Sequence, residues 1–180
     1  MSAEAASPEQ PVTLAALVNT LAGWLAKSYG LTPGDLAALR RMDARHPPAA
    51  FFKLEGLVLD AHLPGDADKR EDSETRWAVI VQGLAHLGTL HAPRERLGGA
   101  LAEAGFSELR FARLLQANAD QLIDELPLLA RFLAAKGVAA DWAGAARLIL
   151  SAGRPDQETA RRHLARDYYG AVARAKSRRP

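Results

Sequence analysis

The sequence predicts an all-α protein, a compact helical bundle of about nine helices joined by short links. Apolar residues recur at three- and four-residue spacing along most of the chain, and glycine or proline marks most of the interruptions. No segment shows the sustained alternation of apolar and polar residues that is typical of a half-buried strand. With 180 residues, 48% of them apolar, the chain has the size and composition of one ordinary folded domain.

Three helices are predicted in the first third of the chain. Residues 11–29 carry one apolar stripe, which Gly30 ends. Thr32 is the expected N-cap of a second helix that runs to about Asp43. A third helix covers about residues 49–61. Its expected inward side chains are Phe51, Leu54, Leu57 and Val58.

A charged loop is predicted at residues 63–72, followed by the clearest core helix at residues 73–90. Asp66 and Asp68 have the spacing of the first two ligands of a calcium loop. Arg70, however, occupies the third ligand position, and the glycine that such a loop requires is missing. The sequence therefore predicts a solvated loop without a metal.

Two short helices are expected to meet at a glycine corner within residues 97–117. Gly105 follows the first helix, and Ser107 can cap the second. Arg110 and Arg113 leave the same side of the second helix. The expected apolar row lies roughly opposite them and consists of Leu109, Ala112 and Leu115. A DNA-reading helix-turn-helix has this spacing, but any helical bundle needs such corners, so both interpretations stay open.

The remaining helices complete a single domain. They are expected at residues 120–136, with a bend or restart at Pro127, then after an N-cap at Asp141, and last at about residues 156–175. The predicted organisation is a disordered N-terminal tail at 1–10, one helical domain at 11–173 with a possible lobe junction near 91–97, and a disordered basic tail at 174–180.

The basic residues are mostly arginine. Formal net charge is only +2, but 18 of the 23 bases are Arg, and residues 154–180 hold eight bases against three acids. Arginine presents a planar fork that matches phosphate oxygens, so the excess is compatible with nucleic-acid binding. A GC-rich genome produces the same excess without any such function. The position of the charges is therefore more informative than their number.

Sequence signatures of an enzyme are missing. The chain has no cysteine, which excludes disulfides, a thiolate nucleophile and a cysteine-ligated zinc site. It also lacks a nucleophile elbow, a phosphate-binding loop, a His-Glu-x-x-His motif and a dinucleotide fingerprint. We therefore expect a binding protein with no catalytic residues, cofactor or metal. The absence of signal-peptide features and of a long apolar run predicts a cytoplasmic protein with no membrane partner.

Four segments, taken in order, resemble a known family. They are Asp35-Leu-Ala-Ala-Leu-Arg-Arg41, Phe51-Phe-Lys-Leu54, residues 97–117 and Asp141-Trp-Ala-Gly-Ala-Ala-Arg147. From about residue 14 to residue 169 the chain resembles the CasB family, the small subunit of the type I-E Cascade complex of CRISPR immunity. The resemblance implies a non-catalytic protein that sits in two copies along a crRNA-guided complex. The implied partners are the backbone filament subunit, the large subunit, a second copy of the chain, crRNA and target DNA.

The resemblance also implies which basic residues contact nucleic acid. The family's basic positions fall on Arg40, Arg41, Lys53, Arg76, Arg110, Arg131, Arg161 and Arg162. Arg113 and Arg166 are added from helical spacing alone. Gln116 and Ala119 stand where relatives can be basic. For arginines at helix ends, a role in offsetting the helix dipole stays open.

The expected function is to hold nucleic-acid backbone, namely the displaced non-target DNA strand and the crRNA–target region, and so to stabilise the R-loop. This function requires arginines from separate helices to converge into one positive track. Two alternatives remain. A helix-turn-helix DNA-binding regulator would depend most on Arg110 and Arg113, and a helical protein-interaction scaffold would have no nucleic-acid role.

Overall fold

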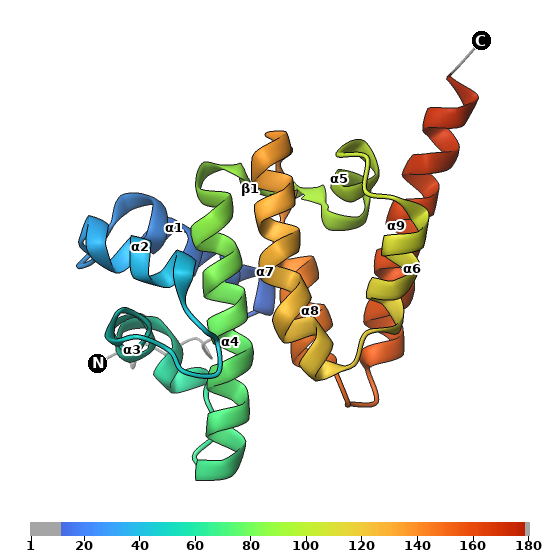
Figure 1. Cartoon of the computed structure of the whole chain (residues 1–180). Coiled ribbons are helices and arrows are strands. Elements are labelled where there is room, and N and C mark those ends of the chain that lie inside the picture. The colour runs from blue at the N-terminus through green and yellow to red at the C-terminus, as the bar shows by residue number, and fades with distance from the viewer. Residues whose placement is uncertain (1–11, 179–180) are drawn as a thin grey trace, which may run out of the picture.

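Nine α-helices dominate the computed structural model, which describes residues 12–178 (Figure 1). They are α1 (Leu14–Lys27), α2 (Pro33–Arg41), α3 (Ala49–Leu54), α4 (Ala67–Leu87), α5 (Leu97–Glu103), α6 (Glu108–Gln116), α7 (Ala119–Lys136), α8 (Ala143–Ser151) and α9 (Gln157–Ser177). Short connecting elements are η1 (Glu55–Leu59), η2 (Asp60–His62), η3 (Gly88–Leu90), β1 (His91–Arg96) and β2 (Ala140–Asp141). The all-α prediction is confirmed. The tail predicted at residues 1–10 lies outside the described residues.

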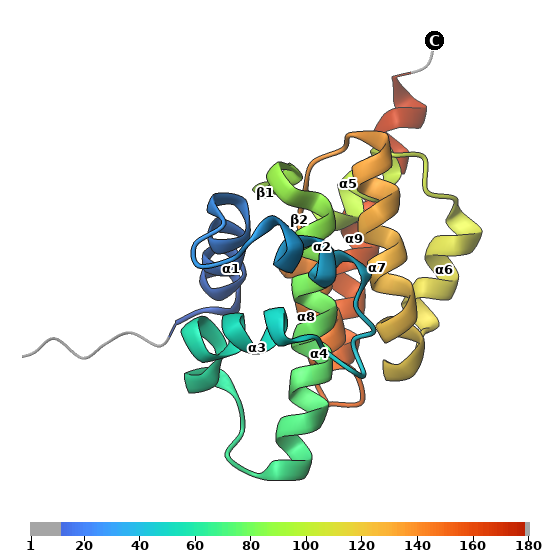
Figure 2. The ribbon, with the colours of Figure 1, turned by 60° about the vertical axis from the view of Figure 1, so that its left-hand side comes forward.

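Helix α4 is the central element of the fold. It packs most extensively against α7 and also contacts α1, α2 and α8, while α5 packs against α9. Helices α1, α2 and α3 lie on one side of α4, and α5, α6 and α9 lie beyond α7 on the other (Figure 1). Figure 2 shows α1 and α6 at opposite edges of the molecule. One cluster of buried apolar side chains extends across these elements from Leu17 to Tyr168.

Two glycines allow helices to approach closely. A Cβ atom at Gly98 would lie 2.5 Å from the carbonyl oxygen of Leu164 and 2.7 Å from the backbone nitrogen of Tyr168, so only glycine lets α5 lie this near to α9. A Cβ atom at Gly83 would lie 2.3 Å from the ring of Trp142. The positions of α8 and α9 therefore depend on residues without side chains.

Helix α4 begins earlier than the sequence pattern indicates, at Ala67 rather than at Ser73. Asp66 is the N-cap, and its carboxylate accepts a hydrogen bond from the backbone N–H of Lys69 at 3.1 Å. Arg70 forms ion pairs that tie this first turn to η1 and η2 and to the next turn of α4. Its partners are Glu55, Asp60 and Glu74. The prediction of a solvated loop through residue 72 is therefore wrong, because the cap and these ion pairs extend the helix.

Helix α6 has the predicted cap but a different buried side. The Ser107 hydroxyl accepts a hydrogen bond from the backbone at the predicted position. Phe111 and Leu114 are buried, whereas Leu109 is 65% exposed. Phe111 stacks on Tyr168 of α9 with ring centroids 3.8 Å apart. The predicted apolar row that began at Leu109 is therefore wrong, because this stacking contact sets the rotation of α6.

Three further local predictions differ from the structure. Leu57 is 54% exposed, because it lies in the π-helical turn η1, which shifts the α-helical phase of the stripe. Strands β1 and β2 form a short parallel pair, although β1 contains Pro93 and shows no alternation that would have predicted a strand. Residues 174–177, expected in a disordered tail, continue α9, where basic residues in the last turn complement the helix dipole.

Candidate nucleic-acid interface

Three of the predicted arginines line one groove of about 570 Å³ between the end of α2, the C-terminal half of α4 and the middle of α7. We call it the α2–α7 groove. Its charged lining residues are Arg40, Arg41, Asp43, Arg45, Asp124 and Arg131. Sequence reasoning missed Arg45. The signal was available, because Arg45 lies close to the Arg40–Arg41 pair in the sequence. The groove thus brings together four arginines and two aspartates.

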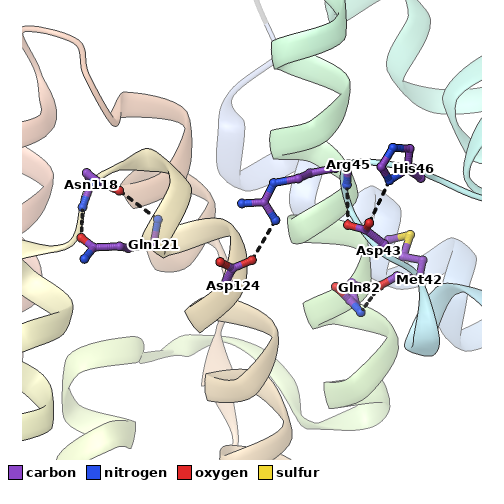
Figure 3. A network of polar contacts seen from close by, with 8 residues as sticks. All are labelled: Met42, Asp43, Arg45, His46, Gln82, Asn118, Gln121 and Asp124. Carbon is purple, nitrogen blue, oxygen red and sulfur yellow. Dashed lines mark hydrogen bonds and ion pairs between the residues drawn. The ribbon is translucent and has the colours of Figure 1, made fainter.

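The end of α2 is fixed to α4 by hydrogen bonds. The amide of Gln82 donates to the carbonyl oxygen of Met42 at 2.8 Å (Figure 3) and to that of Arg40 at 3.3 Å. Arg40 Nε donates in turn to the carbonyl oxygen of Ala85 at 2.8 Å. These bonds satisfy carbonyl groups that a helix end leaves free. The Nε bond also holds the Arg40 side chain in the groove. The terminal nitrogens of Arg40 form no hydrogen bond with the described residues.

The two aspartates of the groove have partners within the protein. Asp124 accepts a hydrogen bond from Arg45 Nη1 at 2.8 Å across the gap between the loop after α2 and helix α7 (Figure 3). Asp43 lies 2.9 Å from His46 Nδ1 and accepts from the backbone N–H of Arg45 at 3.0 Å. The hydrogen bond with His46 contributes most, and together these contacts hold the pKa of Asp43 below its ordinary value. The other three arginines of the groove have no carboxylate partner among the described residues.

His86 also lines the α2–α7 groove. Burial, followed by the charge of Arg131, holds the pKa of His86 below its ordinary value of 6.5. This shift favours the neutral imidazole. The positive charge of this groove at neutral pH comes from guanidinium groups, which stay charged over the physiological range.

A second groove of about 220 Å³ lies between α6 and α7 and contains Arg110 and Arg113 with one acid, Glu125. We call it the α6–α7 groove. Leu128, which is 56% exposed, lines this groove and the α2–α7 groove, so the two adjoin over α7. The Arg110 guanidinium lies 4.5 Å from the centroid of the Phe106 ring. This cation–π contact orients the side chain while leaving its terminal nitrogens available.

A third groove of about 390 Å³ lies between α6 and α9 and contains Arg161 and Arg162. Arg161 is half-buried and donates from Nη2 to the carbonyl oxygen of Ala117 at 2.9 Å. Arg162 forms an ion pair with Glu158 at 2.9 Å. We call the three grooves together the arginine track. Its predicted members are Arg40, Arg41, Arg110, Arg113, Arg131, Arg161 and Arg162.

Three predicted residues lie outside the track. Lys53 pairs with Asp35 in the capping box of α2 at 3.0 Å. Arg76 is buried and donates at 2.7 and 2.8 Å to two carbonyl groups at the end of α8, so its guanidinium is committed to the core and is not presented to a ligand. Arg166 is exposed but lines a hollow on another side of α9.

Neither a membrane span nor a metal cluster occurs in the part of the chain that the structure describes. Within residues 12–178, no helix combines the length and the apolar character needed to cross a bilayer. In the same range, no three histidine, aspartate or glutamate side chains gather in a way that could hold a metal ion.

Fold and site together define a helical protein with an arginine-lined surface. Residues 35–169 match the family model described as CRISPR-associated protein Cse2, and the chain belongs to this family. The Cse2 family, also called CasB, provides a subunit of the CRISPR Cascade complex. The chain is similar to the crystal structure of M. ruber CasB, with a TM-score of 0.66 and 19% identity over 94% of this chain and 99% of that one. That likeness shows the fold. A comparison with curated proteins finds no match.

Proposed function

We propose that the chain is the non-catalytic small subunit of a type I-E Cascade complex and that its arginine track holds the displaced non-target DNA strand beside the crRNA–target region. Its partners in the complex are the backbone filament subunit, the large subunit and a second copy of itself. One observation supports the proposal: seven predicted arginines, contributed by α2, α6, α7 and α9, line three grooves, two of which adjoin at Leu128.

Phosphate contacts of this kind stabilise an R-loop efficiently. The guide–target duplex is about as stable as the DNA duplex that it replaces, so modest contacts to the displaced strand shift the balance toward the open form. The exposed large aromatic residues are Tyr29, Phe52 and Tyr169, and none of them lines the three grooves. Binding therefore rests on phosphate contacts more than on base stacking, and it is independent of sequence.

The geometry of α6 favours this function over sequence-specific duplex reading. A recognition helix inserts its exposed side into the major groove. On α6, Arg110 packs over the Phe106 ring, and Arg110 and Arg113 both face a groove against α7. The arginines of α6 therefore line a channel between two helices.

R-loop formation by the reconstituted complex tests the proposal. Arg113→Gln with Arg131→Gln removes two exposed track charges, and Lys53→Gln, which removes one charge outside the track, is the control. We expect the double variant to assemble into the complex and to lower the yield of permanganate-reactive displaced strand several-fold, while the control retains it. Normal R-loop yield for the double variant over a range of salt concentrations would contradict the proposed function.

A further inference from the structure

A second set of cations lies on another side of α9. One hollow of about 670 Å³ and an adjoining one of about 800 Å³ share Arg94 and Arg96 of β1. We call their combined lining the α9–β1 surface. Its principal cations are Arg94, Arg96, Arg147, Arg166, Arg174 and Lys176. Apart from Arg166, these residues were not among the predicted contacts.

Helix α9 separates this surface from the arginine track. Arg161 and Arg162 line the groove against α6, whereas His163 and Arg166 line the hollow against β1 and α8. At 3.6 residues per turn, positions 161 and 163 point to opposite sides of the helix, whereas Arg162 and Arg166 lie next to each other one turn apart. The two hollows therefore lie on opposite sides of α9, and the two surfaces adjoin where Arg162 and Arg166 meet.

Much of the positive charge on the α9–β1 surface is not neutralised. Asp167 is paired with Arg96 at 2.9 Å, and Asp141 accepts a hydrogen bond from the backbone N–H of Ala143 at 2.9 Å. Glu95 and Glu103 are the other acids in the two hollows. Four exposed arginines of this surface have no carboxylate partner among the described residues: Arg94, Arg147, Arg166 and Arg174. Like charges gathered in a hollow raise the local potential and favour an anionic ligand.

The lining favours a phosphodiester backbone over an acidic protein segment. Protein interfaces centre on large apolar or aromatic anchors. The exposed large apolar side chains of the described chain all lie outside these two hollows. They are Val12, Tyr29, Phe52, Leu57, Leu109, Leu128 and Tyr169. Arginines drawn from β1, α8 and α9, without such an anchor, match the repeated phosphates of a nucleic acid.

We propose that the α9–β1 surface binds a second nucleic-acid backbone, so that one chain holds two strands at the same time. The inference rests on the proposed function, since the arginine track takes the first strand. Binding at the second surface depends on phosphate contacts and is therefore sensitive to salt.

The number of oligonucleotides bound per chain tests this inference. The probe is a short oligothymidine, added in excess at low salt to the full-length chain and counted by native mass spectrometry. We expect two bound per chain for the wild type and one for Arg94→Gln with Arg166→Gln. One is also expected for Arg113→Gln with Arg131→Gln, a matched loss of two charges in the track. Combining all four substitutions is expected to weaken both sites, so that little oligonucleotide stays bound at the probe concentration that fills both sites of the wild type.

The outcomes separate the two proposals. Two oligonucleotides still bound by the Arg94/Arg166 variant, or one bound by the wild type, would overturn the second surface. Two still bound by the Arg113/Arg131 variant would instead count against the track. A polyglutamate peptide provides a further arm: if the Arg94/Arg166 variant loses only this peptide, the surface is a protein-docking site and the inference fails. Circular dichroism checks folding, and Arg147→Gln with Arg174→Gln repeats the test at exposed positions of the same surface.

Discussion

The salt dependence of binding by the isolated chain is the sharpest test of the arginine track. The perturbation is Arg113→Gln with Arg131→Gln in a parent chain that already carries Arg94→Gln and Arg166→Gln, so that only the track binds. Arg113 and Arg131 are exposed, line adjoining grooves and form no ion pair with the described residues. Glutamine therefore removes two charges without leaving a buried partner unsatisfied, and stability should change by less than about 0.5 kcal/mol.

The size of the effect follows from counterion release. Each phosphate contact on a single strand contributes about 0.7 to the slope of log K against log salt concentration, so losing two contacts lowers the slope by about 1.4. If the variants bind equally at about 1 M salt, each lost contact weakens binding roughly fivefold at about 0.1 M, which is one decade lower in salt concentration. Losing both contacts therefore weakens binding about 25-fold at about 0.1 M. A 25-fold loss is about 1.9 kcal/mol of binding free energy.

Fluorescence anisotropy with a labelled oligothymidine over a range of salt concentrations measures this slope. Lys53→Gln in the same parent chain loses one charge outside the track, where Lys53 pairs with Asp35 at 3.0 Å. We expect that control to keep the parent slope. If the parent, the control and the double variant share one slope and one affinity, the track does not hold the strand, and the reasoning from convergent arginines is refuted.

Three further predictions concern the scaffold. Arg76→Ala should lower the free energy of unfolding in urea by about 3 kcal/mol, because two carbonyl groups at the end of α8 lose a buried charged donor. Gly98→Ala should be destabilising by about 2 kcal/mol, since its Cβ would lie 2.5 Å from the Leu164 carbonyl oxygen, while Gly99→Ala has open space and should be tolerated. Burial holds the pKa of His91 below 6.5, so the unfolded chain binds its proton at higher pH. The contribution of His91 to stability is then complete above pH 6.5 and declines below it. Denaturant titrations should show a smaller loss for His91→Gln than for the wild type, since His86 still contributes in the variant.

Local features of the fold could be predicted because their causes lie within a few residues. Thr32 and Ser107 cap α2 and α6 as predicted, since an N-cap hydroxyl meets a backbone N–H three residues further on. Gly137 ends α7 with a positive φ of 65°, as its position predicts. Helix number and order follow from such signals together with the three- and four-residue apolar spacing.

Features set by distant contacts could not be predicted. The rotation of α6 depends on the contact between Phe111 and Tyr168, which are far apart in sequence. Arg76 is buried because its donors reach carbonyl groups at the end of α8, and no local signal distinguishes it from an exposed arginine. The α2–α7 groove forms because Gln82 fixes the end of α2 to α4, which brings Arg40 to the same hollow as Arg131.

Spacing along one helix also does not determine which surface an arginine joins. Arg162 and Arg166 lie about one turn apart on α9, yet one lines the groove against α6 and the other the hollow against β1 and α8. Their separation follows from the packing of α9, which Phe111 of α6 contacts on one side and Gly98 of α5 approaches on another. Because α9 is held between these neighbours, its basic residues divide into two sets. The number of strands that one chain can hold is therefore decided by the packing of α9 more than by the number of arginines in the sequence.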